Sequence, residues 1–168
     1  GWMMWNWLIS VLASKASIVL FDGFPMYKRD DLLLKIANKE NITLFGVSAK
    51  YVDALRKTRK NFKKVYELKK LRTICSTGSP LSADCFKYVY KNIKKNVHLA
   101  SISGGTDIVS CFVLGNLYQS VHAGEIQSKG LGMDVRVFNE KGKSILNQKG
   151  ELVCVNPFPS MPSKFWND

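Results

Sequence analysis

Runs typical of strands alternate with runs typical of helices through residues 1–107, and this alternation constrains the fold more than any other feature. Short apolar runs rich in β-branched residues occupy residues 17–21, 43–47, 72–77 and 97–102. Helical patterns separate them. Alternation of this kind is typical of a mainly parallel sheet with flanking helices, so we predict an α/β fold for this part of the chain.

Four helices are predicted from their apolar faces and their starting residues. The first, at residues 2–13, is apolar on all sides, so we expect it to be buried on most faces. Asp30 and Asp31 favour the start of the second, because carboxylates stabilise a helix N-terminus. Ser48 and Ser82 can cap the third and the fourth by accepting hydrogen bonds from free backbone amides.

The pattern changes after Asp107. Residues 108–113, 135–139 and 151–155 are short alternating runs separated by turns, and no helical pattern lies among them. Such runs are typical of antiparallel strands. We therefore expect one domain in two portions, an α/β portion at residues 1–107 and a small antiparallel β portion at residues 108–168.

The net charge of +12 is concentrated in residues 56–72, where a single acid, Glu67, lies among nine basic residues. A segment like this is usually a solvated connector whose charge other parts of a protein balance. The alternative is a nucleic-acid-binding domain. No helix-turn-helix, zinc-finger or aromatic RNA-binding signature accompanies the charge, so we expect no nucleic-acid partner.

Cysteine spacing and the apolar first segment bear on the compartment. The four cysteines form no Cys-x-x-Cys pair, which predicts a reducing compartment and no structural zinc. The apolar segment is shorter than the roughly 20 residues that a membrane span needs. We expect a cytosolic protein without a span. The chain opens at Gly1 without an initiator Met and closes on Trp166-Asn167-Asp168, so we also expect an internal segment of a longer protein.

Two glycine-containing segments follow predicted parallel strands, at residues 77–80 and 101–107. Glycines let backbone amides approach an anion, the Thr106 hydroxyl can donate to a phosphate oxygen, and the Asp107 carboxylate can bind Mg²⁺. Spacing alone does not distinguish a phosphate site from an ordinary turn. His98 alternates within an apolar strand and is interpreted as a structural residue.

Six blocks of the sequence, in order along the chain, resemble the acetoacetyl-CoA synthetase family, a member of the adenylate-forming superfamily together with the acyl-CoA ligases. The blocks are residues 1–7, 76–81, 101–108, 124–127, 131–133 and 150–154. The resemblance covers essentially the whole chain. It implies part of the large N-terminal domain of that superfamily and a ligase that joins acetoacetate to coenzyme A with ATP and Mg²⁺, by way of acetoacetyl-adenylate, in fatty acid and ketone-body metabolism.

The resemblance also implies roles for particular residues. Those that match the family's AMP and ATP contacts are Gly78, Ser79, Pro80, Ser101, Ile102, Ser103 and Thr106. Thr106 matches the threonine that contacts phosphate. Asp107 stands where most members have a glutamate associated with Mg²⁺, and because aspartate is one methylene shorter, its contact with the metal is expected to pass through water.

Gly104 stands where acetate-specific relatives have a tryptophan that closes a small acyl pocket, so the resemblance implies room for acetoacetate here. Thr77 and Trp2 lie in blocks that flank the same pocket, and simple core packing is the alternative for Trp2. The family's lysine-bearing phosphate loop, ribose-binding aspartate and C-terminal lysine are not found among these residues. We therefore expect no ligase turnover from the chain alone; a truncated copy that acts at most as a binding module is the alternative.

Overall fold

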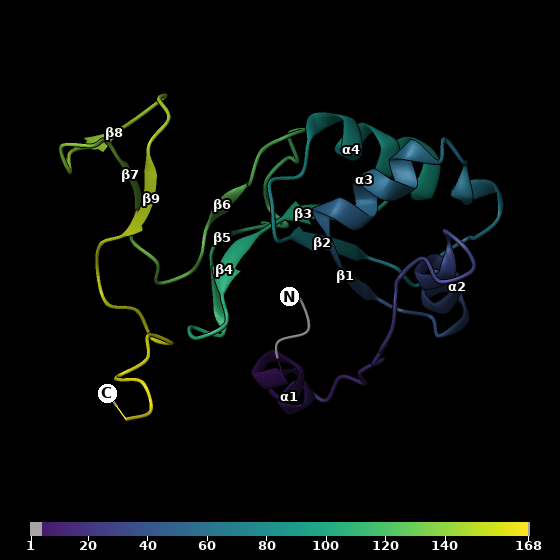
Figure 1. The fold of residues 1–168 in the computed structure, drawn as a ribbon, viewed down its shortest axis with the longest axis horizontal. Helices are drawn as coiled ribbons and strands as arrows, with labels where there is room; N and C mark the ends of the chain where they lie inside the picture. Colours follow the sequence, from purple (N-terminus) through teal and green to yellow (C-terminus); the bar gives the residue numbers. More distant parts are fainter. Residues whose placement is uncertain (1–4, 168) are drawn as a thin grey trace.

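The computed structural model describes residues 5–167 and contains three sheets of three strands each. The first is parallel, in the order β1-β2-β3; the second and the third are antiparallel, in the orders β4-β5-β6 and β8-β7-β9. Figure 1 shows them in succession, with β8 at the opposite end of the molecule from α2. The predicted fold class, a parallel α/β part followed by antiparallel strands, is confirmed.

The parallel sheet consists of β1 (Leu44–Ser48), β2 (Thr73–Thr77) and β3 (His98–Ser101). Helices α3 (Ala49–Lys57) and α4 (Ala83–Tyr88) lie beside each other over this sheet (Figure 1), and a π-helical turn, η2 (Val89–Ile93), continues α4. Both predicted caps are confirmed. The Ser48 hydroxyl accepts from the Tyr51 amide at 3.1 Å, and the Ser82 hydroxyl accepts from the Cys85 amide at 3.3 Å.

Two helices precede this sheet, α1 (Trp5–Ala13) and α2 (Leu32–Lys39). Asp31 is the N-cap residue of α2 but makes no side-chain capping bond. Burial of the first helix on most faces is wrong for the side chains that the structure describes: Leu8 is buried, but Leu12 is half exposed.

The predicted strand at residues 17–21 is wrong, because residues 16–20 have no regular structure. Val19 and Leu20 are exposed. A run of β-branched residues becomes a strand only where a neighbouring strand accepts and donates its backbone hydrogen bonds, and no such neighbour adjoins this run among the residues described. The local sequence pattern does not show whether a neighbouring strand will be present.

The second sheet consists of β4 (Ser103–Gly105), β5 (Ser110–Leu114) and β6 (Ser128–Lys129). The third consists of β7 (Val135–Phe138), β8 (Ser144–Ile145) and β9 (Glu151–Cys154). We expected the segment after the strand at residues 97–102 to be a loop over residues 103–107, and this is wrong for its first three residues. They pair with β5 as a strand, and only residues 106–109 form the turn of that hairpin.

The main core lies between the parallel sheet and its helices. Its fully buried side chains include Phe86, Leu34, Leu55 and Leu99. A much smaller cluster of Ile108, Met133 and Val135 supports the junction of the antiparallel sheets. Among residues 5–167, no helix is both long and apolar enough for a membrane crossing.

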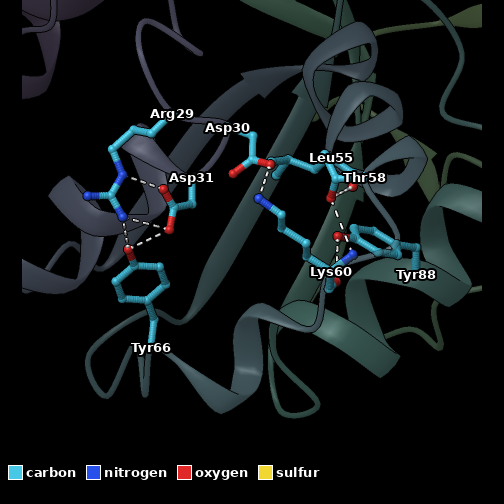
Figure 2. Close-up of polar contacts among 8 residues, drawn as sticks. All are labelled: Arg29, Asp30, Asp31, Leu55, Thr58, Lys60, Tyr66 and Tyr88. Carbon is cyan, nitrogen blue, oxygen red and sulfur yellow. Dashed lines mark hydrogen bonds and ion pairs between the residues drawn. The ribbon is translucent and has the colours of Figure 1, made fainter.

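The basic segment is folded rather than a free connector. A short 3-10 turn, η1 (Phe62–Lys64), starts its central part, and Phe62, Tyr66, Leu68 and Leu71 are all buried. Figure 2 shows two acids fixing it: Lys60 forms an ion pair with Asp30 at 2.6 Å, and Tyr66 donates to Asp31 at 2.7 Å. The segment is thus a connector between α3 and β2 whose basic side chains are mostly exposed, as interpreted from the sequence, and four buried side chains hold it against the core.

Candidate functional site

The two glycine-containing segments leave adjacent parallel strands at the same edge of the sheet. Ser76 in β2 is paired with Ser101 in β3, and the Ile102 amide donates to the Ser76 carbonyl oxygen at 2.9 Å. Carboxyl ends of parallel strands are where open α/β sheets bind ligands. The structure therefore brings together the starts of the segments at residues 77–80 and 101–107, and this edge is the candidate site.

The bend after β2 requires a glycine because of its backbone conformation. Gly78 has φ of 86°, a region that side chains with a Cβ rarely adopt, while nothing lies within 4 Å of a Cβ added there. Gly78, Ser79 and Pro80 are exposed, and Thr77, the last residue of β2, is half-buried. The bend therefore presents bare backbone and short side chains to solvent.

The segment after β3 passes from the core to the surface. Ser101 is buried, Ile102 and Ser103 are half-buried, and Gly104 is exposed. Because its side chain is buried, Ser101 can contact a ligand at this edge only through its backbone groups. Among the residues predicted to contact AMP, Ser79, Pro80 and Thr106 have exposed side chains, and those of Ile102 and Ser103 are half-buried.

The β4-β5 hairpin gives a structural reason for glycine at position 104, and the sequence did not reveal it. A Cβ added at this position would lie 2.1 Å from the Ser110 carbonyl oxygen and 2.7 Å from the Cys111 Cα, both in the backbone of β5. The register of the β4-β5 hairpin also shifts between Ser103 and Gly104. A side chain here would therefore require β4 and β5 to move apart, whatever ligand the site binds.

Thr106 and Asp107 lie exposed in the turn between β4 and β5. The Val109 amide donates to the Thr106 carbonyl oxygen at 3.2 Å, and Val109 has φ of 47°. Positive φ is a genuine outlier for a β-branched residue, and backbone strain of this kind is concentrated at ligand-binding sites. The turn that carries the predicted phosphate and metal residues is thus held in an unfavourable conformation by the hairpin around it.

Two thiols near this edge are unsuited to nucleophilic chemistry. Burial raises the pKa of Cys75 in β2 to about 11, and burial also raises the pKa of Cys111 in β5. Because the thiolate is the nucleophile, both groups stay protonated and weakly reactive at neutral pH. Next to Cys75, the Ser76 hydroxyl is fully buried and has no hydrogen-bond partner in the described part of the chain.

His98 takes part in a polar network that the sequence did not reveal. Its Nε2 lies 2.8 Å from the Gln127 side-chain oxygen, which also accepts from the Asn116 amide at 3.0 Å. The Gln127 amide nitrogen donates to the carbonyl oxygens of Asn116 and Gln119. One glutamine side chain thereby ties the segment between β5 and β6 to β3, which agrees with the interpretation of His98 as a structural residue.

A metal at this edge depends on a single carboxylate. No group of three His, Cys, Asp or Glu residues in residues 5–167 could hold a metal ion by itself. Mg²⁺ commonly binds proteins through one or two carboxylates and completes its shell with waters and substrate phosphates. The exposed Asp107 fits that kind of site and does not fit a metal site built of protein ligands alone. Trp2 lies outside the described residues.

Comparison with known proteins shows the family. The model of the AMP-binding enzyme family matches residues 2–161. An acetoacetyl-coenzyme A synthetase of Rhizobium meliloti (strain 1021) is 54% identical over 168 residues, which are 100% of this chain and 26% of that protein. An acetoacetyl-CoA synthetase of Gallus gallus is 48% identical over 170 residues, covering 100% of this chain and 25% of that protein. The chain thus spans about a quarter of the length of these relatives.

Solved structures agree with this. The acetoacetyl-CoA synthetase of Streptomyces lividans superposes with a TM-score of 0.88 and 42% identity, covering 100% of this chain and 26% of that one. The anthranilate CoA ligase AuaEII, in complex with anthranoyl-AMP, superposes with a TM-score of 0.67 over 82% of this chain and 25% of its own; at 20% identity, it supports the fold alone. Since the family match extends over nearly all of the sequence, this chain belongs to the AMP-binding enzyme family.

Proposed function

We propose that the full-length protein is an AMP-forming acetoacetate:CoA ligase, and that this chain contributes the adenine-binding and acyl-binding side of its active site. The observation that carries the proposal is the 2.9 Å hydrogen bond from the Ile102 amide to the Ser76 carbonyl oxygen, because it fixes the two glycine-containing segments side by side. Similarity to acetoacetyl-CoA synthetases over the whole chain supports the choice of acid and thiol.

The bend after β2 is proposed to receive the adenine base. Gly78 has no side chain, and Ser79 and Pro80 are exposed, so a planar base can lie against the backbone of the bend. Ser101, Ile102 and Ser103 follow the neighbouring strand and form the adjoining wall. Polar backbone groups at the ends of these strands can hydrogen-bond the edge of the base.

The turn of the β4-β5 hairpin is proposed to receive the phosphate. The Thr106 hydroxyl donates to an oxygen of the α-phosphate, and this donation stabilises the negative charge that grows there in the transition state. Asp107 would hold Mg²⁺ through water, and the ion would neutralise negative charge on the phosphates of ATP. Both residues are exposed at the turn, where a nucleotide can reach them.

Gly104 and Thr77 are proposed to line the acyl side, with Trp2 as a third contact. Gly104 is exposed and presents no side chain to the acid, and acetoacetate, with four carbons and a second carbonyl group, needs more volume than acetate. In the proposed reaction, the acid carboxylate attacks the α-phosphorus and pyrophosphate leaves; the sulfur of coenzyme A then attacks the acyl carbon and AMP leaves.

Turnover is proposed to need the full-length protein. Charge stabilisation during adenylation requires groups that converge from several segments, and losing any of them removes a large part of the rate acceleration. The lysine-bearing loop and the C-terminal lysine of the superfamily are not among these 168 residues. The chain by itself is therefore expected to bind AMP weakly at best.

The test measures pyrophosphate release and thioester formation by the full-length protein with ATP, coenzyme A and either acetoacetate or acetate. We expect a higher kcat/KM for acetoacetate, and a preference for acetate would overturn the acyl assignment. Thr106→Val should lower kcat/KM by about 10²-fold, because one transition-state donor is lost. Thr43→Val is the matched control, since Thr43 precedes β1 at the opposite edge of the sheet. Equal activity of the two variants would overturn the phosphate assignment.

A further inference from the structure

The basic segment and the end of η2 enclose a hollow of about 210 Å³. Three lysines, Lys63, Lys94 and Lys95, line it together with Asn96. A concave surface lined by charges of one sign raises the local concentration of oppositely charged ligands. The hollow therefore attracts anions, because three of its lining residues are lysines and one is an acid.

Contacts beneath the hollow hold its walls in place. Lys94 donates through Nζ to the Leu68 carbonyl oxygen at 2.6 Å. Ile93, which also lines the hollow, is buried. Tyr66, which also lines the hollow, is buried and donates to the Asp31 carboxylate at 2.7 Å, and Arg29 binds the same carboxylate (Figure 2). A ligand would thus meet a surface that needs little ordering, which lowers the entropic cost of binding.

The helix leading into the hollow ends in an unusual way. The Lys94 amide donates to the Val89 carbonyl oxygen at 3.0 Å, five residues back, and closes the π-helical turn of η2. Single π-turns are rare and are frequent at functional sites. Here the wide turn brings two consecutive lysines, Lys94 and Lys95, to the rim of one cavity.

The positive charge of the hollow is not neutralised by its neighbours. Lys63 and Lys95 form no ion pair within the described part of the chain, where Asp30 and Asp53 are already engaged by other basic residues. The only acid at the hollow is Glu67, and its carboxylate binds Lys69 at 2.8 Å. Two free ammonium groups thus face solvent across a preformed cavity.

The hollow lies at the edge of the sheet opposite to the candidate nucleotide site. Lys94, Lys95 and Asn96 come just before β3, whereas the nucleotide segments follow β2 and β3. The five residues of β2 separate the two edges by about 16 Å, at about 3.3 Å per residue. An anion in the hollow therefore cannot contact a nucleotide base or an α-phosphate held by Gly78 and Thr106.

We propose that this hollow is a second binding site, specific for phosphate-bearing polyanions and independent of the nucleotide site. Lys63 and Lys95 bind the phosphate oxygens directly, the Asn96 amide donates a further hydrogen bond, and Lys94 positions the rim through its bond to Leu68. Ammonium groups are compact point charges that bind phosphate well, and several of them favour an anion with more than one phosphate group.

The test uses inorganic tripolyphosphate as the probe and isothermal titration calorimetry of the full-length protein, with saturating AMP present to occupy the nucleotide site. We expect one saturable site besides the AMP site. Lys63→Gln with Lys95→Gln should weaken tripolyphosphate binding by about tenfold or more, because two charge-assisted hydrogen bonds are lost. Lys63→Arg with Lys95→Arg should retain it, since the charge and the donors remain.

The matched control is Lys141→Gln with Lys143→Gln, which removes the same net charge from the exposed turn between β7 and β8. This pair should leave binding within about twofold of the wild type. Equal weakening by both glutamine pairs would show nonspecific charge attraction and overturn the site, as would the absence of saturable binding. Salt-steep binding of duplex DNA that needs residues outside the hollow as much as Lys63 and Lys95 would assign the charge to nucleic acid instead. None of these outcomes depends on ligase activity.

Discussion

The parallel sheet and the third sheet of this protein differ in how they are held together. Strand β3 contributes Leu99, which is fully buried between the sheet and its helices, whereas β9 contributes Leu152, which is 48% exposed. No helix lies over β7, β8 and β9 in Figure 1, and the cluster near them contains three buried residues. A sheet with one uncovered face buries little apolar surface, so stability is concentrated in the parallel half.

The candidate site lies where these two kinds of structure meet. The bend proposed to bind adenine follows β2 in the parallel half, and the turn proposed to bind phosphate belongs to the β4-β5 hairpin that begins the antiparallel half. The bend therefore follows a strand that packs in the main core, whereas the turn belongs to a hairpin that is less buried. The difference suggests a test: we expect ligand position here to depend on contacts between the halves, such as the contact of Gln127 with His98 at 2.8 Å.

The largest contrast between the halves is expected from truncating one leucine in each. Leu99→Ala should lower the free energy of unfolding by about 2–5 kcal/mol, because it leaves a cavity in the main core. Leu152→Ala should cost less than about 1 kcal/mol, because the side chain is half exposed. Urea denaturation followed by circular dichroism measures both. Similar costs for the two variants would contradict the unequal distribution of stability.

The junction between the halves can be tested at neighbouring glycines. Gly104→Ala places a methyl group 2.1 Å from the Ser110 carbonyl oxygen, so the hairpin must shift and stability should fall by about 1–3 kcal/mol. Gly105→Ala is the control, since its Cβ would meet only the Ile108 Cγ1, at 3.7 Å. Amide hydrogen exchange should rise at residues 103–114 in the first variant alone. Unchanged exchange in Gly104→Ala would show that the strands are farther apart than described.

Acid sensitivity should also differ between the halves. Hydrogen bonds from Arg29 and Tyr66 lower the pKa of Asp31 from 3.8 to about 2. A carboxyl group with a lowered pKa in the folded state stabilises the protein above its unfolded pKa, and this contribution is lost as the pH falls through the folded pKa. Asp31→Asn should therefore cost about 1–2 kcal/mol at neutral pH and almost nothing near pH 2.

The control for Asp31 lies in the antiparallel half. The pKa of Asp134 is also lowered, by a hydrogen bond from Arg136, but that pair is exposed and salt screens it. Asp134→Asn should leave the pH dependence of stability close to that of the wild type. Urea midpoints measured from pH 7 to pH 2 make the comparison. If Asp31→Asn lost stability in the same way as the wild type between about pH 4 and pH 2, the Asp31 network would not be the source of the acid sensitivity.

The smallest effect is expected at Ser76. Its hydroxyl is fully buried without a hydrogen-bond partner among the described residues, so Ser76→Ala should raise stability by up to about 1 kcal/mol. Ser144→Ala in the exposed strand β8 should change nothing measurable. Thermal unfolding can resolve the pair. A clear loss of stability in Ser76→Ala would mean that the hydroxyl has a partner in solution.

Local patterns predicted much of the parallel half correctly. Residues 43–47, 72–77 and 97–102 were predicted as strands and correspond to β1, β2 and β3 within one residue at each end. The caps at Ser48 and Ser82 were predicted from residue type alone, because a hydroxyl that accepts from an amide three residues ahead needs no distant partner. The prediction failed at residues 17–21, where the missing element was a neighbouring strand.

The candidate site was predicted in part. Both glycine-containing segments were identified, but the reason for Gly104 was not, since it lies in the backbone of β5 and not in the local sequence. The network of Gln127 and the hollow at Lys63 and Lys95 were missed for the same reason. Each of them joins residues about 30 positions apart along the chain.

The sequence by itself determined the order of strands and helices, the two polar segments after β2 and β3, and an excess of positive charge. Tertiary structure decided which strands have neighbours, which glycine must lack a side chain, and which of the lysines share one cavity. The physical reason is the distance along the chain over which each interaction acts. Helix caps, turns and apolar periodicity act over a few residues, while strand pairing, close backbone approach and charge convergence depend on segments that only folding brings together.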